Sequence, residues 1–243
     1  MTRLYHGWAG LGAVVIIASI AGCGSGTGLE PQEYGAVEAL ALDSLAEVPI
    51  DCSAEQQPLP YASELIAFEI GDAGGYGSAK LPEIVLGPPR GGGHATGSLD
   101  VLSLGVGGEI VLGFGDRVLR DGPGVDLIVF ENAFWVGGDP TVVWAELGEV
   151  SVSTDGQRWY TFLCEPERGI TWEGCAGWRP VLSYDVCKHQ PLDFSTTGGA
   201  GFDFADLDID FVRFVRIRDL ATDGAAPSAG FDLDAVGAVY FER

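Results

Sequence analysis

Basic residues are scarce in this chain. Lysine and arginine number 13 among 243 residues, against 35 aspartates and glutamates, which gives a formal net charge of −22. Such a negative field repels phosphate backbones and anionic lipid head groups, which argues against nucleic acid as a partner. It suits cations, cationic surfaces or neutral sugars, although acidity can also serve solubility alone.

Catalytic and zinc-binding motifs are also missing. After the first 22 residues the histidines are His94 and His189, and the chain has no H-E-x-x-H, G-x-S-x-G or C-x-x-C motif. The sequence therefore gives no indication of a zinc protease or of a serine hydrolase of the α/β type. The paired carboxylates of a glycosidase leave no local motif, so a carboxylate-based hydrolase remains an alternative to a non-enzymatic protein.

No apolar run is long enough to span a bilayer. The longest one near the start covers residues 11–20, follows Arg3, and leads through Ile20, Ala21 and Gly22 to Cys23. This arrangement is typical of a secretory signal, and its ending resembles the bacterial lipobox. The resemblance implies cleavage before Cys23 and lipidation of that cysteine, with an ordinary signal peptide as the alternative. We expect residues 1–22 to be removed and the protein to be exported and lipid-anchored to the bacterial cell envelope, at the outer membrane or cell surface.

Four cysteines remain if Cys23 carries lipid. They are Cys52, Cys164, Cys175 and Cys187. An oxidising compartment favours two disulfides, for which there are three pairings. We favour Cys164 with Cys175 and Cys52 with Cys187, since the first closes a short loop and the second ties the N-terminal lead to the domain. A zinc site is the competing interpretation, and the spacing does not favour it.

The composition after the signal predicts a tether followed by one domain. Residues 23–60 begin with a Gly-, Ser- and Glu-rich stretch typical of a flexible tether and continue into an N-terminal lead with a short helix at 36–47. Residues 61–243 are enough for one domain with a single core. The whole chain is 47% apolar with six tryptophans, and its 37 glycines and 13 prolines favour a turn-rich β-protein.

Alternation of apolar and polar residues predicts an all-β, antiparallel β-sandwich. Strands are expected at 64–70, 100–104, 109–114, 125–130, 212–218 and 231–240. The clearest hairpin covers 149–162, where Val150 and Val152 alternate with serines and Asp155 and Gly156 form the turn. Residues 125–130 are apolar at five of six positions, which indicates a strand buried on both faces.

Several short motifs recur together in known β-sandwich proteins. They are VSVSTDGQRW at 150–159, FVRI at 214–217 and GFDLDAV at 230–236. This combination resembles the galactose-binding-like (discoidin-type) superfamily, which implies a jelly-roll sandwich. With PEIVLGP at 82–88, GSLDVLSLG at 97–105 and DLIVFEN at 126–132, the run from Phe68 resembles an uncharacterised family of bacterial cell-surface proteins and predicted lipoproteins.

Oxygen-bearing side chains gather in two of these motifs. Asp232 and Asp234 are two apart on an expected strand and so share one face, while Glu131 and Asn132 end another strand. Carboxylate and amide oxygens suit calcium, and members of the resembled superfamily often hold a structural calcium. A calcium site at these four residues is therefore one hypothesis. The alternative is that Arg216 and Arg218, on a neighbouring strand, pair with the two aspartates.

Tryptophans in expected loops are candidate ligand-binding residues. Trp135 precedes a loop that contains Asp139, and Trp172 and Trp178 flank Cys175. Loop tryptophans can stack on sugar rings while an adjacent aspartate binds hydroxyls. They can equally cover the ends of the core.

These features favour a surface protein that recognises a carbohydrate or another protein without catalysis. Its membrane attachment is the lipid anchor, a structural calcium is the one candidate cofactor, and nucleic acid is not expected as a partner. The alternatives are a carboxylate-based glycan hydrolase and a purely structural envelope lipoprotein.

Overall fold

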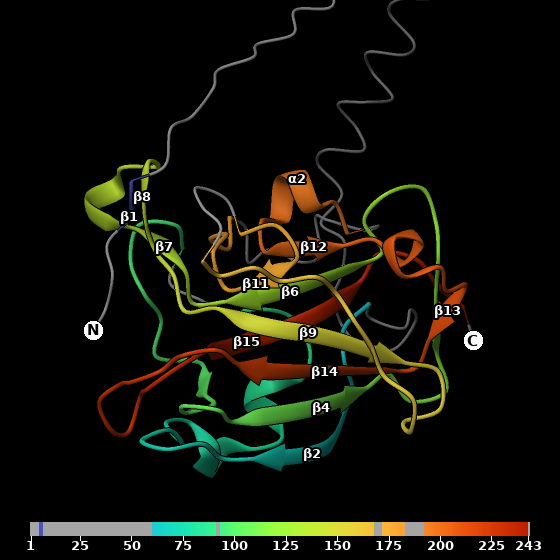
Figure 1. Cartoon of the computed structure of the whole chain (residues 1–243), viewed down its shortest axis with the longest axis horizontal. Helices are drawn as coiled ribbons and strands as arrows, with labels where there is room; N and C mark the ends of the chain where they lie inside the picture. The colour runs from blue at the N-terminus through green and yellow to red at the C-terminus, as the bar shows by residue number, and fades with distance from the viewer. Residues whose placement is uncertain (1–4, 7–59, 91–92, 168–171, 183–191, 243) are drawn as a thin grey trace, which may run out of the picture. The chain divides into compact units, whose positions relative to one another are not determined.

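Two antiparallel β-sheets form the body of the protein. A computed structural model describes residues 5–6, 60–90, 93–167, 172–182 and 192–242 (Figure 1). All strand pairs in these residues are antiparallel, and helix is limited to short turns. The prediction of an all-β protein is confirmed.

The strands of the larger sheet follow the order β10-β9-β14-β4-β2. A sixth strand, β11, also pairs with β9. Its strands are β2 (Glu64–Glu69), β4 (Glu109–Gly113), β9 (Gly148–Ser153), β10 (Tyr160–Thr161), β11 (Cys175–Ala176) and β14 (Phe214–Asp219). The long strands β9, β14, β4 and β2 lie in succession across the front of Figure 1.

The second sheet has the order β12-β6-β15-β3. Its strands are β3 (Leu102–Ser103), β6 (Leu127–Glu131), β12 (Ala200–Phe202) and β15 (Asp232–Ala238). Two smaller sheets are β1-β8-β7 and β13-β5-β16. Their strands are β1 (Tyr5–His6), β7 (Phe134–Trp135), β8 (Val142–Trp144), β5 (Val118–Arg120), β13 (Phe211–Val212) and β16 (Phe241–Glu242).

One apolar core joins the two main sheets. Ile217 of β14 and Val150 of β9 are fully buried in the same cluster as Leu127 of β6 and Leu233 of β15. Because residues from both sheets meet in this cluster, the sheets pack face to face as a β-sandwich.

Strand β6 is buried on both of its faces, as its unbroken apolar sequence predicts. Leu127 and Val129 point into the core between the sheets. Ile128 and Phe130 belong to a second cluster, with Tyr61. The sequence of β6 therefore does not alternate between apolar and polar residues, because other parts of the chain cover both faces of the strand.

The predicted hairpin is confirmed in strands β9 and β10. Tyr160 lies opposite Val152, and Thr161 lies opposite Ser151. The Asp155 carboxylate accepts hydrogen bonds from the backbone N–H groups of Gln157 (2.8 Å) and Arg158 (2.9 Å). These bonds fix the turn that the sequence places between the two strands.

The glycine-rich turn at 105–108 joins strands of different sheets. β3 pairs with β15, whereas β4 pairs with β2 and β14. A Cβ atom on Gly108 would lie 2.1 Å from the carbonyl oxygen of Leu104, so only glycine fits where the chain crosses. The turn therefore passes from one layer to the other instead of closing a hairpin.

The helical segments are short. They are η1 (Ser78–Lys80), η2 (Glu83–Val85), η3 (Val136–Gly138), α2 (Phe194–Thr197) and η4 (Phe204–Leu207). Asp193 caps α2, and Asp203 caps η4 by accepting the N–H of Ala205 at 2.9 Å. Within the described ranges, no helix has the length and hydropathy needed to cross a bilayer.

Candidate functional site

The end of β6 and the start of β15 bring together three of the four predicted metal ligands. The side-chain nitrogen of Asn132 lies 3.4 Å from Oδ2 of Asp232, and the backbone N–H of Asn132 donates to the carbonyl of Asp232 at 3.2 Å. Asp232 also accepts a hydrogen bond from the hydroxyl of Ser103. Glu131 lies across the strand pair from Leu233. The two expected motifs therefore meet, because their strands are neighbours in one sheet.

Asp234 is placed differently from the sequence expectation. The register of β15 against β6 shifts between Leu233 and Ala235, so Asp234 sits at a β-bulge and the simple two-residue alternation fails there. Its Oδ1 accepts the backbone N–H of Arg90 at 2.8 Å, and the residue is 3% exposed.

Arg216 and Arg218 do not pair with these aspartates. Strand β14 lies in the other sheet, between β9 and β4, so the expected adjacency to β15 is wrong. The Arg216 guanidinium lies 3.8 Å from Glu109 and 4.6 Å from the centre of the Trp159 ring. This alternative for the acidic residues is therefore wrong.

Glu131 is a buried acid with an unsatisfied oxygen. It is 2% exposed, and within the described part of the chain its Oε2 has no hydrogen-bond partner. Burial raises the pKa of Glu131 well above its ordinary value, and the negative charges of Glu146 and Asp232 raise it further. Backbone N–H groups of Asn132 and Asp232 offset part of this rise.

Glu146 joins the cluster from the connection between β8 and β9. Burial raises its pKa to about 8, with further contributions from the charges of Asp232 and Asp219, and the indole of Trp144 lowers it by hydrogen bonding. Glu146 belongs to none of the motifs that carry the resemblance, so the sequence alone does not indicate it. We define Glu131, Glu146 and Asp232 as the carboxylate cluster.

Asp219 lies near the carboxylate cluster, and its side chain forms hydrogen bonds with the backbone of nearby loops. Its side chain accepts backbone N–H groups from Gly107 (3.0 Å), Ala221 (2.9 Å) and Phe231 (2.7 Å). These hydrogen bonds lower the pKa of Asp219, but burial has the larger effect and raises it above its ordinary value. With its oxygens so occupied, Asp219 holds the loops before β15 in place.

A second acidic group lies elsewhere in the fold. Among the described residues, Asp121, Asp126 and Asp203 are the group whose carboxylate oxygens all approach within 4.8 Å. Each oxygen of Asp126 accepts a backbone N–H, from Gly122 at 2.8 Å and from Phe204 at 2.7 Å. Burial raises the pKa of Asp126 to about 6. The central acid of this group is therefore already satisfied by the protein.

Aromatic side chains adjoin the carboxylate cluster. Phe134 and Trp144 stack with ring centres 6.1 Å apart, and the rings of His94 and Trp135 lie 4.7 Å apart. The Phe134 ring and the Asn132 side chain both approach Gly97, at 3.5 Å and 3.3 Å from a Cβ built there. His94 is exposed and the other three rings are partly exposed. Phe134 lies opposite Trp144 and Trp135 lies opposite Val143, so the two pairs of rings lie on opposite faces of the β7–β8 hairpin. We define these four residues, on both faces of the hairpin, as the aromatic surface.

Asp139 holds the turn after the aromatic surface. Its Oδ1 accepts hydrogen bonds from the backbone N–H (2.9 Å) and the hydroxyl (2.7 Å) of Thr141. The residue is exposed and lies between β7 and β8. The structure thus places Asp139 on the same hairpin as Trp135, as the sequence predicts.

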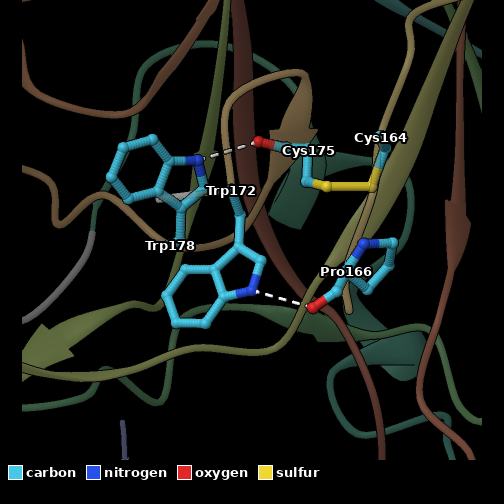
Figure 2. The surroundings of a disulfide bond; sticks show 5 residues. All are labelled: Cys164, Pro166, Trp172, Cys175 and Trp178. Atoms are coloured by element: carbon cyan, nitrogen blue, oxygen red, sulfur yellow. Dashed lines mark hydrogen bonds between the residues drawn. A yellow bond between two sulfur atoms is a disulfide. The ribbon is translucent and has the colours of Figure 1, made fainter. Parts of the chain in front are cut away.

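Trp172 and Trp178 lie beside the disulfide and do not belong to the aromatic surface (Figure 2). Cys164 and Cys175 are bonded, which confirms one predicted pairing. Trp172 is 6% exposed and donates its indole N–H to the carbonyl of Pro166, while Trp178 donates to the carbonyl of Cys175. Trp172 therefore covers the core. Cys23, Cys52 and Cys187 lie outside the described residues.

A hollow of about 590 Å³ lies beside the edge strand β2, away from these groups in the sequence and the sheet order. Its lining is mostly apolar and includes no member of the carboxylate cluster or the aromatic surface: Ser63, Glu64, Leu65, Ile66, Leu81, Pro82 and Leu86.

Comparison with known proteins does not assign the chain to a family. No protein-family model matches the chain, and no curated protein matches it. Function therefore has to be argued from the residues themselves.

Proposed function

We propose that this chain is a lipid-anchored protein of the bacterial envelope whose sandwich recognises a carbohydrate through the aromatic surface. The observation that carries the proposal is that Phe134 and Trp144 remain partly exposed beside Asn132 and Glu146, and that Trp135 is partly exposed on the other face of the same hairpin. Partly exposed aromatic rings next to amide and carboxylate oxygens are suited to stacking on sugar rings and binding their hydroxyls. A jelly roll of the galactose-binding-like type is the finer fold that we propose for the two sheets.

The charge of the protein favours a neutral ligand. If residues 1–22 are removed with Arg3, 12 basic and 35 acidic residues remain, a net charge of −23. An anionic polymer would be repelled, so neutral oligosaccharides are the first ligands to test. A surface protein with a basic patch is the other partner compatible with this charge.

Removal of the signal would also change the surroundings of β8. Tyr5 and His6 of β1 pair with Val143 and Val142 of β8, and both residues lie in the segment expected to be cleaved. The mature chain would then keep β7 and β8 as a two-stranded hairpin that carries Trp135 and Trp144.

Trp135→Ala is expected to weaken binding of a neutral oligosaccharide by roughly three- to tenfold, the loss of one aromatic contact. Binding would be screened on an array of neutral and acidic glycans with the full-length protein and then measured by calorimetry for the best ligand. Trp159→Ala is the matched control, because Trp159 packs against Arg216 of the larger sheet and is not part of the aromatic surface.

Three results would contradict the recognition proposal. One is that no glycan on the array binds the protein. Another is that Trp135→Ala and Trp159→Ala lose the same amount of binding affinity. The third is release of new reducing ends from a bound glycan, abolished by Glu146→Gln. It would replace recognition with carboxylate-based hydrolysis, our second candidate, which the position of Glu146 beside Trp144 favours.

Cys23→Ser is expected to release the protein from the membrane fraction of a bacterial host into the soluble fraction. Stable anchoring requires more than one acyl chain, and the proposed lipidation would supply these chains at this residue alone. Fractionation followed by immunoblotting measures the change, with Cys164→Ser as a control that keeps Cys23. Retention of the Cys23→Ser variant in the membrane would contradict the proposed anchor.

A further inference from the structure

Strand β2 is the longest edge strand in the described part of the chain. It has six residues (Glu64–Glu69), pairs with β4 on one side, and ends the order β10-β9-β14-β4-β2 (Figure 1). The other edge strands of the described sheets have two or three residues. Short edge strands protect a sheet against pairing with further chains, and β2 does not have this protection.

The outer edge of β2 offers free backbone groups. Among the described residues, no backbone hydrogen bond joins residues 64–70 to any segment other than β4. The strand contains neither proline nor lysine, the residues that commonly blunt an edge. Its irregularity is a bulge between Leu65 and Ala67, after which the register with β4 is regular to Glu69. Unpaired N–H and C=O groups in a row are a template for an added strand.

Exposed apolar side chains and a hollow lie along this edge. Ile66 is 49% exposed and Ile70 is 56% exposed. The hollow of about 590 Å³ beside β2 is lined by Ile66 and its neighbours from the strand, and by Leu81 and Leu86, which follow η1 and η2. Its volume is within the range of ligand sites in proteins, so it has room for an apolar side chain of an added strand.

The charges around the edge favour a basic segment. Glu64 and Glu69 lie at the two ends of β2, and Glu83 lies in η2. All three are exposed, and none takes part in the ion pairs among the described residues. The nearest basic residues in the sequence are Lys80 and Arg90, and both pair with Asp100, at 3.5 Å and 3.8 Å. The acids of the edge are therefore available to positive charges of a partner.

We propose that the free edge of β2 binds an extended, basic segment of another protein by β-strand addition. Backbone hydrogen bonds hold the segment, an apolar side chain enters the hollow, and lysine or arginine side chains face Glu64 and Glu69. A second copy fits less well, because antiparallel pairing of β2 with itself places Glu64 of each copy opposite Glu69 of the other. This binding does not depend on the proposed carbohydrate recognition, since no residue of the hollow belongs to the aromatic surface.

The probe is a synthetic peptide in which lysine and valine alternate over about ten residues, which spans β2 at roughly 3.3 Å per residue. Fluorescence anisotropy with the full-length protein should show saturable binding, and hydrogen exchange should slow within residues 64–69. One control peptide has glutamate in place of lysine. Another has proline in place of valine, which keeps the charge but removes backbone donors. Both should bind more weakly by roughly tenfold or more.

Ile66→Lys should weaken binding of the lysine–valine peptide by roughly tenfold, because it places a like charge on the edge. Glu69→Lys is a second variant with the same expected direction, since Ile66 lies at the bulge and its replacement can affect folding. Thermal melting checks the fold of both. Leu99→Lys is the matched control, because Leu99 is 77% exposed and lies outside β2 and the hollow. It should bind the peptide as the wild type does.

Four results would overturn the proposal. The lysine–valine peptide does not bind, or it binds no better than the proline peptide, so that charge alone attracts it. Binding is unchanged in both Ile66→Lys and Glu69→Lys, which places the peptide elsewhere. The wild type forms a dimer in analytical ultracentrifugation that dissociates in Ile66→Lys, which makes a second copy the occupant of the edge.

Discussion

In buffer containing a chelator, the protein is expected to lose stability as the pH rises from about 4.5 to about 8. Glu146 has a pKa near 8 in the folded chain and an ordinary value in the unfolded chain. Between these two values the unfolded state binds fewer protons than the folded state, so the free energy of unfolding falls as the pH rises. The neighbouring acids Glu131, Asp232 and Asp219 are shifted in the same direction and add to the fall.

Glu146→Gln should remove a large part of this dependence. Each pKa unit corresponds to about 1.4 kcal/mol, so the contribution of Glu146 at pH 8 has an upper limit of roughly 4 to 5 kcal/mol. The glutamine keeps an oxygen that can accept the indole N–H of Trp144, so the shape of the site is retained. Urea unfolding between pH 4 and pH 9 measures the difference.

Glu149→Gln is the control for the pH experiment, because Glu149 lies on β9 opposite Arg218 and outside the carboxylate cluster. It should follow the wild-type curve. Stability that stays constant or increases between pH 5 and pH 8 in the wild-type protein would contradict the assignment of raised pKa values to the cluster.

Removal of the disulfide is expected to destabilise the protein by about 3 kcal/mol. Cys164 and Cys175 are separated by 11 positions, and the loop-closure entropy of a loop of this length has about that magnitude. Cys175 is also fully buried in β11, which pairs with β9 beside Trp172. The double variant Cys164→Ala with Cys175→Ala should therefore unfold at a lower urea concentration than the wild type.

A reducing agent provides the control for the disulfide. It should lower the urea midpoint of the wild-type protein toward that of the double variant and leave the double variant unchanged. Equal midpoints for the oxidised wild type and the double variant would contradict a stabilising role for this bond.

Local sequence patterns predicted the local elements of this fold. Alternating valines and serines before Asp155 and Gly156 are sufficient for the β9–β10 hairpin, because period-two burial and a tight turn are properties of adjacent residues. The apolar run of β6 similarly predicted burial on both faces. The pairing of Cys164 with Cys175 was accessible because the two residues are close in sequence.

Long-range strand order could not be obtained in the same way. The alternative that paired Arg216 and Arg218 with Asp232 failed because β14 and β15, although successive in the chain, lie in different sheets. The bulge at Asp234 changes the direction of one side chain without a sequence signal such as glycine or proline. Glu146 was missed because only the folded connection from β8 to β9 brings it to Asp232.

We propose that an oligosaccharide binds at the aromatic surface beside the carboxylate cluster. The most direct measurement is the indole N–H spectrum of the full-length protein, recorded by NMR as the best neutral oligosaccharide from the array is added. We expect the resonances of Trp135 and Trp144 to shift, while those of Trp159, Trp172 and Trp178 stay in place. Shifts confined to Trp159, or to the pair beside the disulfide, would contradict it.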